Sequence, residues 1–166
     1  MRLIGITLAC LLLSSCKPMA QQKNALTNNA VVFASAEDEK IFTDVERATF
    51  QYFWDGAEPN SGLARERYHN DNIYPQNDKH VVTSGGGGFG VMAILVGIER
   101  NFITRNQGRE RLEKIVGFLE KADRFHGAWP HWWNGETGKV QPFSRYDDGG
   151  DLVESSFMIQ GLLCVR

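Results

Sequence analysis

The chain has 166 residues, of which 42% are hydrophobic and 23% are charged, and its formal net charge is -2 at pH 7. This composition is typical of a globular protein and excludes a wholly disordered one. Because lysine and arginine are spread thinly along the chain, no basic surface is expected for a phosphate backbone, and nucleic acid is excluded as a predicted partner.

The first residues, 1–16, are typical of a bacterial export signal. Arg2 precedes an apolar run over residues 3–13, which is long enough for a signal core and too short to span a bilayer. The run ends in the sequence LSSC, with Cys16 last, and this resembles the lipobox of bacterial lipoproteins, in which the cysteine receives the lipid. An ordinary signal peptide with an incidental cysteine is the alternative. Residues 17–34 are polar and aperiodic, so they predict a flexible tether.

Residues 35–166 are predicted to form one all-α domain. Apolar side chains at helical spacing predict an amphipathic outer helix over about 36–55 and another after Thr104, which forms a capping-box pair with Gln107. Residues 89–99 and 151–165 are apolar on most sides, as inner helices are. Residues 57–83 are a long connection, and no strand is expected. Alternating outer and inner helices predict two hairpins of an α/α toroid.

The end of the sequence has no helix cap. Val165 and Arg166 continue an apolar run without a glycine, a proline or a polar tail. We therefore expect the sequence to stop inside a helix and the toroid to be incomplete, so this chain alone is not expected to be active.

Two loops, over residues 83–90 and 126–151, lead into the inner helices. Because the inner helices are separated by one reversing helix, they are expected to run parallel and to present their N-termini on one rim. A ligand on this rim would meet free backbone N–H groups and the positive ends of two helix dipoles.

The first loop carries a run of four glycines, residues 85–88. The run lacks the Lys-Ser or Lys-Thr ending and the preceding strand of a phosphate cradle. A tight turn, or a close approach of the backbone to a sugar, explains it better. Gly87, Gly88 and Phe89 are therefore candidate substrate-binding residues.

The second loop carries Trp129, His131, Trp132 and Trp133 without helical periodicity. Indole rings suit the flat C–H faces of sugars, so these four residues are candidates for substrate binding, while the alternative is that one or two of the tryptophans plug the top of the domain. The loop's two histidines lack a third converging ligand, so no metal is expected.

Three acidic residues surround the start of the last helix. Asp151 and Glu154 are three positions apart and lie on one helical face, and Asp148 comes just before them. Hydrolysis of a glycosidic bond commonly uses two carboxyl groups, one as the acid and one as the base or nucleophile. These three residues are the candidate catalytic group. The alternative is that Asp151 is only an N-cap and that Glu154 completes a capping box.

Together these motifs resemble the glycoamylase-like domain family, which includes the endo-β-1,2-glucanases of glycoside hydrolase family 144 and glucoamylase-like proteins of gut Bacteroidetes. The matching runs are residues 49–54, 83–90, 128–133 and 148–154. The resemblance covers residues 36–166 and only the first part of the family's domain. It implies an (α/α)6 barrel and a glucan substrate, and it matches Asp151 and Glu154 to acidic positions in the family's cleft.

The expected protein is thus an exported lipoprotein that hydrolyses a glucan, either β-1,2-glucan or starch, without a cofactor. Its membrane contact is expected through the lipid anchor only, and the periplasmic face is favoured because no acidic run follows Cys16. The alternative functions are a non-catalytic carbohydrate-binding lipoprotein and a structural helical scaffold.

Overall fold

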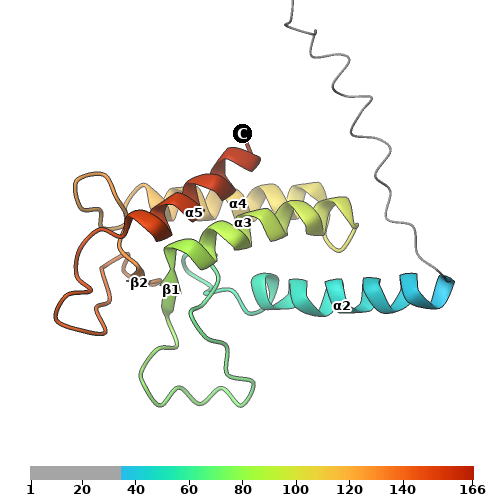
Figure 1. Ribbon diagram of the computed structural model, residues 1–166, viewed down its shortest axis with the longest axis horizontal. Coiled ribbons are helices and arrows are strands. Elements are labelled where there is room, and N and C mark those ends of the chain that lie inside the picture. The colour runs from blue at the N-terminus through green and yellow to red at the C-terminus, as the bar shows by residue number, and fades with distance from the viewer. Residues whose placement is uncertain (1–34) are drawn as a thin grey trace, which may run out of the picture. The chain divides into compact units, whose positions relative to one another are not determined.

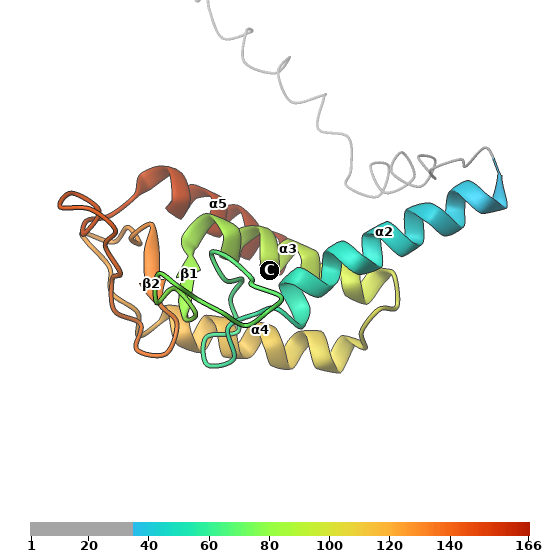
Figure 2. The same cartoon turned by 90° about the horizontal axis from the view of Figure 1, so that it is seen from below.

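Residues 35–166 are described by a computed structural model, drawn in Figures 1 and 2. The predicted signal (residues 1–16), the lipidation at Cys16 and the tether (residues 17–34) lie outside the described residues. The chain divides into two units, residues 1–39 and 40–166. In the described part of the first unit, the Asp38 N–H donates to Ser35 Oγ at 3.1 Å. No helix within residues 35–166 is both long and apolar enough to cross a membrane.

The described chain is helical, as predicted. Its helices are α2 (Ala36–Trp54), α3 (Ser84–Glu99), α4 (Arg105–Leu119) and α5 (Leu152–Cys164). The capping box of Thr104 and Gln107 is present at the start of α4. Helices α3 and α5 run parallel, and α4 runs in the opposite direction (Figure 1). The elements α2–α3 and α4–α5 are the two expected hairpins of an incomplete (α/α)6 barrel.

Helix α3 lies between α4 and α5 (Figure 2) and makes its most extensive contact with α5. Glycines permit this contact because they place no side chain between the two backbones. A Cβ atom on Gly88 would collide with the Phe157 carbonyl and would lie 2.7 Å from the Cα of Met158. A Cβ atom on Gly161 would collide with the backbone of Gly88. The glycines therefore set the distance between the inner helices.

The glycine run was expected as a turn ahead of a helix starting near Phe89, but α3 begins at Ser84. Thr83 caps this start, because its Oγ1 accepts a hydrogen bond from the Gly86 N–H at 3.0 Å. Glycine has a low intrinsic helix propensity. Here the packing against α5 outweighs that propensity, which periodicity alone does not reveal.

A two-stranded sheet corrects the expectation of a chain without strands. Strand β1 (Val81–Thr83) pairs in antiparallel register with β2 (Trp132–Asn134), so that Thr83 lies opposite Trp132. Strands of three residues are too short to show an alternating pattern. The sheet joins the two long loops. It places His131, just before β2, at the end of the sheet where α3 begins.

The apolar core includes Val91 and Ile94 of α3, Ile115 of α4 and Met158 of α5. Trp133 belongs to this core and has 0% of its surface exposed. Its indole N–H donates to the Asp123 carbonyl at 3.2 Å.

Candidate functional site

The N-terminus of α5 is capped by Asp151. Its Oδ1 accepts hydrogen bonds from the backbone N–H groups of Val153 and Glu154, each at 3.0 Å. The structure therefore confirms that Asp151 is the N-cap of α5. Glu154 does not complete a capping box, because the Asp151 N–H donates to the Trp129 carbonyl at 2.8 Å. The Glu154 carboxylate is thus free to bind elsewhere.

Glu154 instead reaches across to α3. Its Oε2 accepts a hydrogen bond from the Gly85 N–H at 2.7 Å, one of the N–H groups that have no partner inside a helix. A Cβ atom on Gly85 would lie only 2.5 Å from this oxygen, so the contact depends on glycine. Glu154 therefore joins the N-termini of the two inner helices, and the predicted shared rim is present.

His131 lies between the two carboxylates. Its Nδ1 is 3.1 Å from Oδ2 of Asp151, and its Nε2 is 3.8 Å from Oε2 of Glu154. The side chains of His131, Asp151 and Glu154 are 35%, 31% and 19% exposed. We call these three residues the rim cluster. The cluster is partly exposed, and both of its carboxylates face one imidazole.

Only one of the three candidate tryptophans is placed on the rim cluster. Trp132 stacks on His131 with a centroid distance of 3.7 Å and meets the edge of Phe143 at 5.1 Å. Trp129 packs against the core and against Trp133. Trp133 is fully buried, in agreement with the alternative that one or two of the tryptophans fill the top of the domain. Its predicted contact with a sugar would require the core to open. The indole N–H groups of Trp129 and Trp132 are buried without a hydrogen-bond partner among the described residues.

The other candidate residues, Gly87, Gly88, Phe89 and Asp148, lie in different surroundings from one another. Gly87 and Gly88 are buried. A Cβ on Gly88 would meet the α5 backbone, and one on Gly87 would meet the side chains of Met158 and Leu63, which makes both glycines packing residues in this structure. Phe89 is 49% exposed and lies 5.4 Å from the ring of Phe157, between centroids. Asp148 is exposed in the loop before α5. The structure does not join it to the rim cluster.

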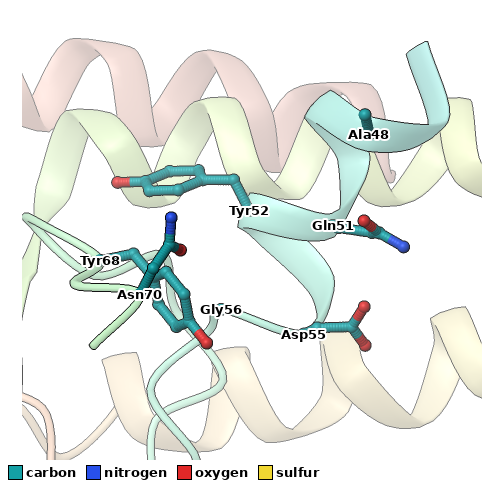
Figure 3. Close-up of a pocket in the computed structure, with 7 residues that line it drawn as sticks. All are labelled: Ala48, Gln51, Tyr52, Asp55, Gly56, Tyr68 and Asn70. Carbon is teal, nitrogen blue, oxygen red and sulfur yellow. The ribbon is translucent and has the colours of Figure 1, made fainter. Parts of the chain in front are cut away.

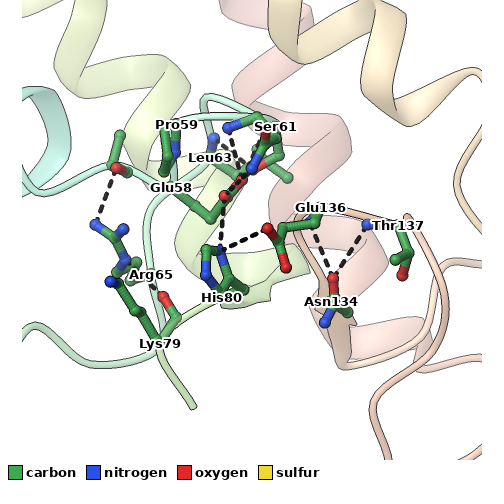
Figure 4. Close-up of polar contacts among 12 residues, drawn as sticks. Glu58, Pro59, Ser61, Leu63, Arg65, Lys79, His80, Asn134, Glu136 and Thr137 are labelled. Carbon is green, nitrogen blue, oxygen red and sulfur yellow. Dashed lines mark hydrogen bonds and ion pairs between the residues drawn. The ribbon is translucent and has the colours of Figure 1, made fainter. Parts of the chain in front are cut away.

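Sequence reasoning missed a second polar cluster, around Glu58 (Figure 4). Glu58 is fully buried and accepts hydrogen bonds from the backbone and hydroxyl of Ser61 at 2.7 and 2.8 Å. Asn60 donates to it as well, and His80 Nδ1 lies 3.2 Å away. Burial raises the pKa of Glu58, but the hydrogen bonds from Ser61, His80 and Asn60 outweigh it, so the pKa is lowered. Because every contact of Glu58 is internal, we assign this cluster to loop structure.

A cavity of about 450 Å³ lies beside the end of α2 (Figure 3). Its lining includes Tyr52, Asp55, Tyr68 and Asn70. The Tyr52 hydroxyl donates to the Arg65 carbonyl at 2.5 Å, and burial, followed by the charge of Glu66, raises its pKa. The side chains of the rim cluster do not line this cavity. Within residues 35–166, no group of three or more His, Cys, Asp or Glu side chains is placed to hold a metal ion.

Comparison with known proteins identifies close relatives. The chain is 76% identical to the endo-β-1,2-glucanase of Chitinophaga pinensis, solved with sophorotriose and glucose, at a TM-score of 0.76, covering 77% of this chain and 31% of that one. It is 66% identical to a glucoamylase-like protein of Bacteroides caccae at a TM-score of 0.73, covering 76% and 31%.

A third relative is the exo-β-1,2-glucooligosaccharide sophorohydrolase of Parabacteroides distasonis, 55% identical over 130 residues, which are 78% of this chain and 17% of that protein. The chain thus spans less than a third of the length of these relatives. No protein-family model matches it.

Proposed function

Since this chain is a homologue of β-1,2-glucanases over about 77% of its length, we propose that it carries the acidic rim of a glycoside hydrolase that acts on a glucan. β-1,2-Glucan is the first candidate substrate, because the relatives with 76% and 55% identity are named for β-1,2-linked substrates. The observation that carries the proposal is the rim cluster, in which two carboxylates meet where both inner helices begin.

The chemistry of the rim cluster suits this reaction. Glycoside hydrolysis uses one protonated carboxyl group to release the leaving oxygen and one carboxylate to activate water or attack carbon. Asp151 and Glu154 are the carboxylates that the rim cluster contributes to this site, with Asp148 as a third acidic residue on the neighbouring loop. Trp132, which stacks on His131, supplies partly exposed ring surface beside the carboxylates for a sugar, and no cofactor is required for this chemistry.

A segment exchange tests the proposal without assuming how the chain continues. The part of this chain that matches the Chitinophaga pinensis endo-β-1,2-glucanase replaces the homologous part of that enzyme, and we call the product the exchange chimera. We expect the chimera to release reducing sugar from β-1,2-glucan and not from starch. Hydrolysis of starch alone would contradict the proposed linkage. A folded chimera that hydrolyses neither glucan would contradict the enzyme function and favour a carbohydrate-binding protein.

We also propose that the protein is exported and anchored through a lipid on Cys16, with the periplasmic face as its place. The support is the apolar run over residues 3–13, the LSSC sequence and the polar stretch that follows. The 166-residue chain by itself is proposed to lack hydrolytic activity, because it supplies less than a third of the length of the relatives named as glucanases.

A further inference from the structure

The two carboxylates of the rim cluster have very different numbers of partners. Asp151 uses both of its oxygens: Oδ1 accepts two backbone N–H groups of α5, and Oδ2 faces His131 Nδ1 at 3.1 Å. Glu154 uses Oε2 alone, which accepts the Gly85 N–H. Among residues 35–166, Glu154 Oε1 is the one oxygen of the four with no hydrogen bond or ion pair. The side chain that carries it is partly exposed.

His131 is fixed on several sides. Its ring is stacked on Trp132 at an interplanar angle of 18°, and its backbone carbonyl accepts the Ser84 N–H at 3.0 Å. The imidazole therefore has little freedom to turn away from Asp151. A distance of 3.1 Å is within hydrogen-bond range, whereas the 3.8 Å from Nε2 to Glu154 is not. The ring is bonded to Asp151 and only faces Glu154.

On this geometry, and resting on the proposed function, we propose that His131 and Asp151 are positioning residues for Glu154, whose Oε1 contacts the glucan. Asp151 fixes the first turn of α5, where Glu154 is placed, and it orients the imidazole. The imidazole in turn flanks Oε2 of Glu154, which leaves Oε1 as the oxygen without a partner among residues 35–166. The two carboxylates, equivalent in the sequence, thereby receive different roles.

The first test reads the hydrogen bond directly. In the full chain with isotope-labelled histidine, and again in the exchange chimera, nitrogen–proton correlation spectra report which ring nitrogen carries the proton. The His131 signals are assigned by their loss in His131→Ala. We expect neutral His131 to carry its proton on Nδ1, because Asp151 Oδ2 can only accept. A proton on Nε2 would overturn the proposal, whatever the activity of the chimera.

The second test separates positioning from sugar binding. In the chimera, His131→Ala should lower kcat on the order of 100-fold through misplacement of Glu154, with KM nearly unchanged. His131→Asn should recover most of the loss, because the amide nitrogen reaches about as far as Nδ1. His131→Gln, which extends toward the position of Nε2, should not. A raised KM at unchanged kcat, or a better rescue by Gln than by Asn, would overturn the proposal.

The matched control is His126→Asn in the same loop. His126 is exposed and has a φ of 50°, a conformation that asparagine tolerates well, so this variant should keep full activity. An unmodified chimera without activity would contradict the proposed function, while the spectroscopic test would still decide the geometry.

Discussion

Replacing Gly88 with alanine should push α5 away from α3. The added Cβ would collide with the Phe157 carbonyl and lie 2.7 Å from the Cα of Met158. These are backbone atoms, which cannot rotate aside as a flexible side chain can. The helices must separate instead. Because Gly85 lies one turn before Gly88, the hydrogen bond from the Gly85 N–H to Glu154 should lengthen as the helices move apart.

The free energy of unfolding is expected to fall by ~1–2 kcal/mol. Overpacking of a well-packed interior costs ~1–3 kcal/mol, and the rigid neighbours place this site at the upper end. Alanine recovers about 1 kcal/mol of helix propensity relative to glycine. The cost of overpacking still exceeds the gain in helix propensity, so the substitution should lower the stability.

Gly117→Ala in α4 is the matched control, because a Cβ on Gly117 meets nothing within 4 Å. This variant should stabilise the protein by ~0.5–1 kcal/mol through helix propensity alone. Thermal unfolding followed by circular dichroism should therefore rank Gly117→Ala above the parent and Gly88→Ala below it, with the two variants roughly 5–10 °C apart. Equal melting temperatures for Gly88→Ala and the parent would refute the packing argument. If glucan affinity alone then fell, Gly88 would be a sugar contact after all.

Three further predictions concern other sites. Glu58→Gln should lower Tm at neutral pH, and the difference in Tm from the parent should disappear in acid. The reason is that a carboxylate whose pKa is lowered in the folded state stabilises the fold above the ordinary glutamate pKa and loses that contribution as pH falls through the lowered pKa. A difference in Tm that is constant with pH would contradict this. Trp133→Ala should destabilise the fold by about 3–5 kcal/mol. Trp132→Ala in the chimera should raise KM for β-1,2-glucan and, because it frees the His131 ring, also lower kcat, with a smaller loss of Tm. Cys16→Ser should abolish incorporation of labelled fatty acid in a bacterial host, and retained labelling would exclude lipidation at Cys16.

The helices and their relative direction could be predicted because the apolar periodicity over residues 36–55 and the Thr104 capping box are local signals. The shared rim could be predicted as well, because two inner helices that are separated by one reversing helix run parallel and present their N-termini at the same end. The start of α3 could not be predicted, since the glycine run is helical only through contact with α5, far away in the sequence. The strands were missed because three residues carry no period.

The candidate site was predicted in part. Residue type and spacing indicate Asp151 and Glu154 as candidates for catalysis and His131 as a candidate for sugar binding, and the structure brings the three side chains together. Sequence alone could not separate Trp132 from Trp133, because neighbouring strand residues point to opposite faces and the inward face was unknown. Nor could it show that Glu58 is buried, because the hydrogen bonds that satisfy this carboxylate come partly from His80, on the far side of a long loop.

Whether Glu154 takes part in glucan hydrolysis is decided by the turnover of β-1,2-glucan by the exchange chimera carrying Glu154→Gln. The amide keeps the shape of the side chain and its contact with the Gly85 N–H, so Tm should stay close to that of the parent. We predict that kcat falls by a factor on the order of 100 or more. A folded Glu154→Gln chimera with near-parental kcat would contradict the account and would reduce Glu154 to a link between two helix ends.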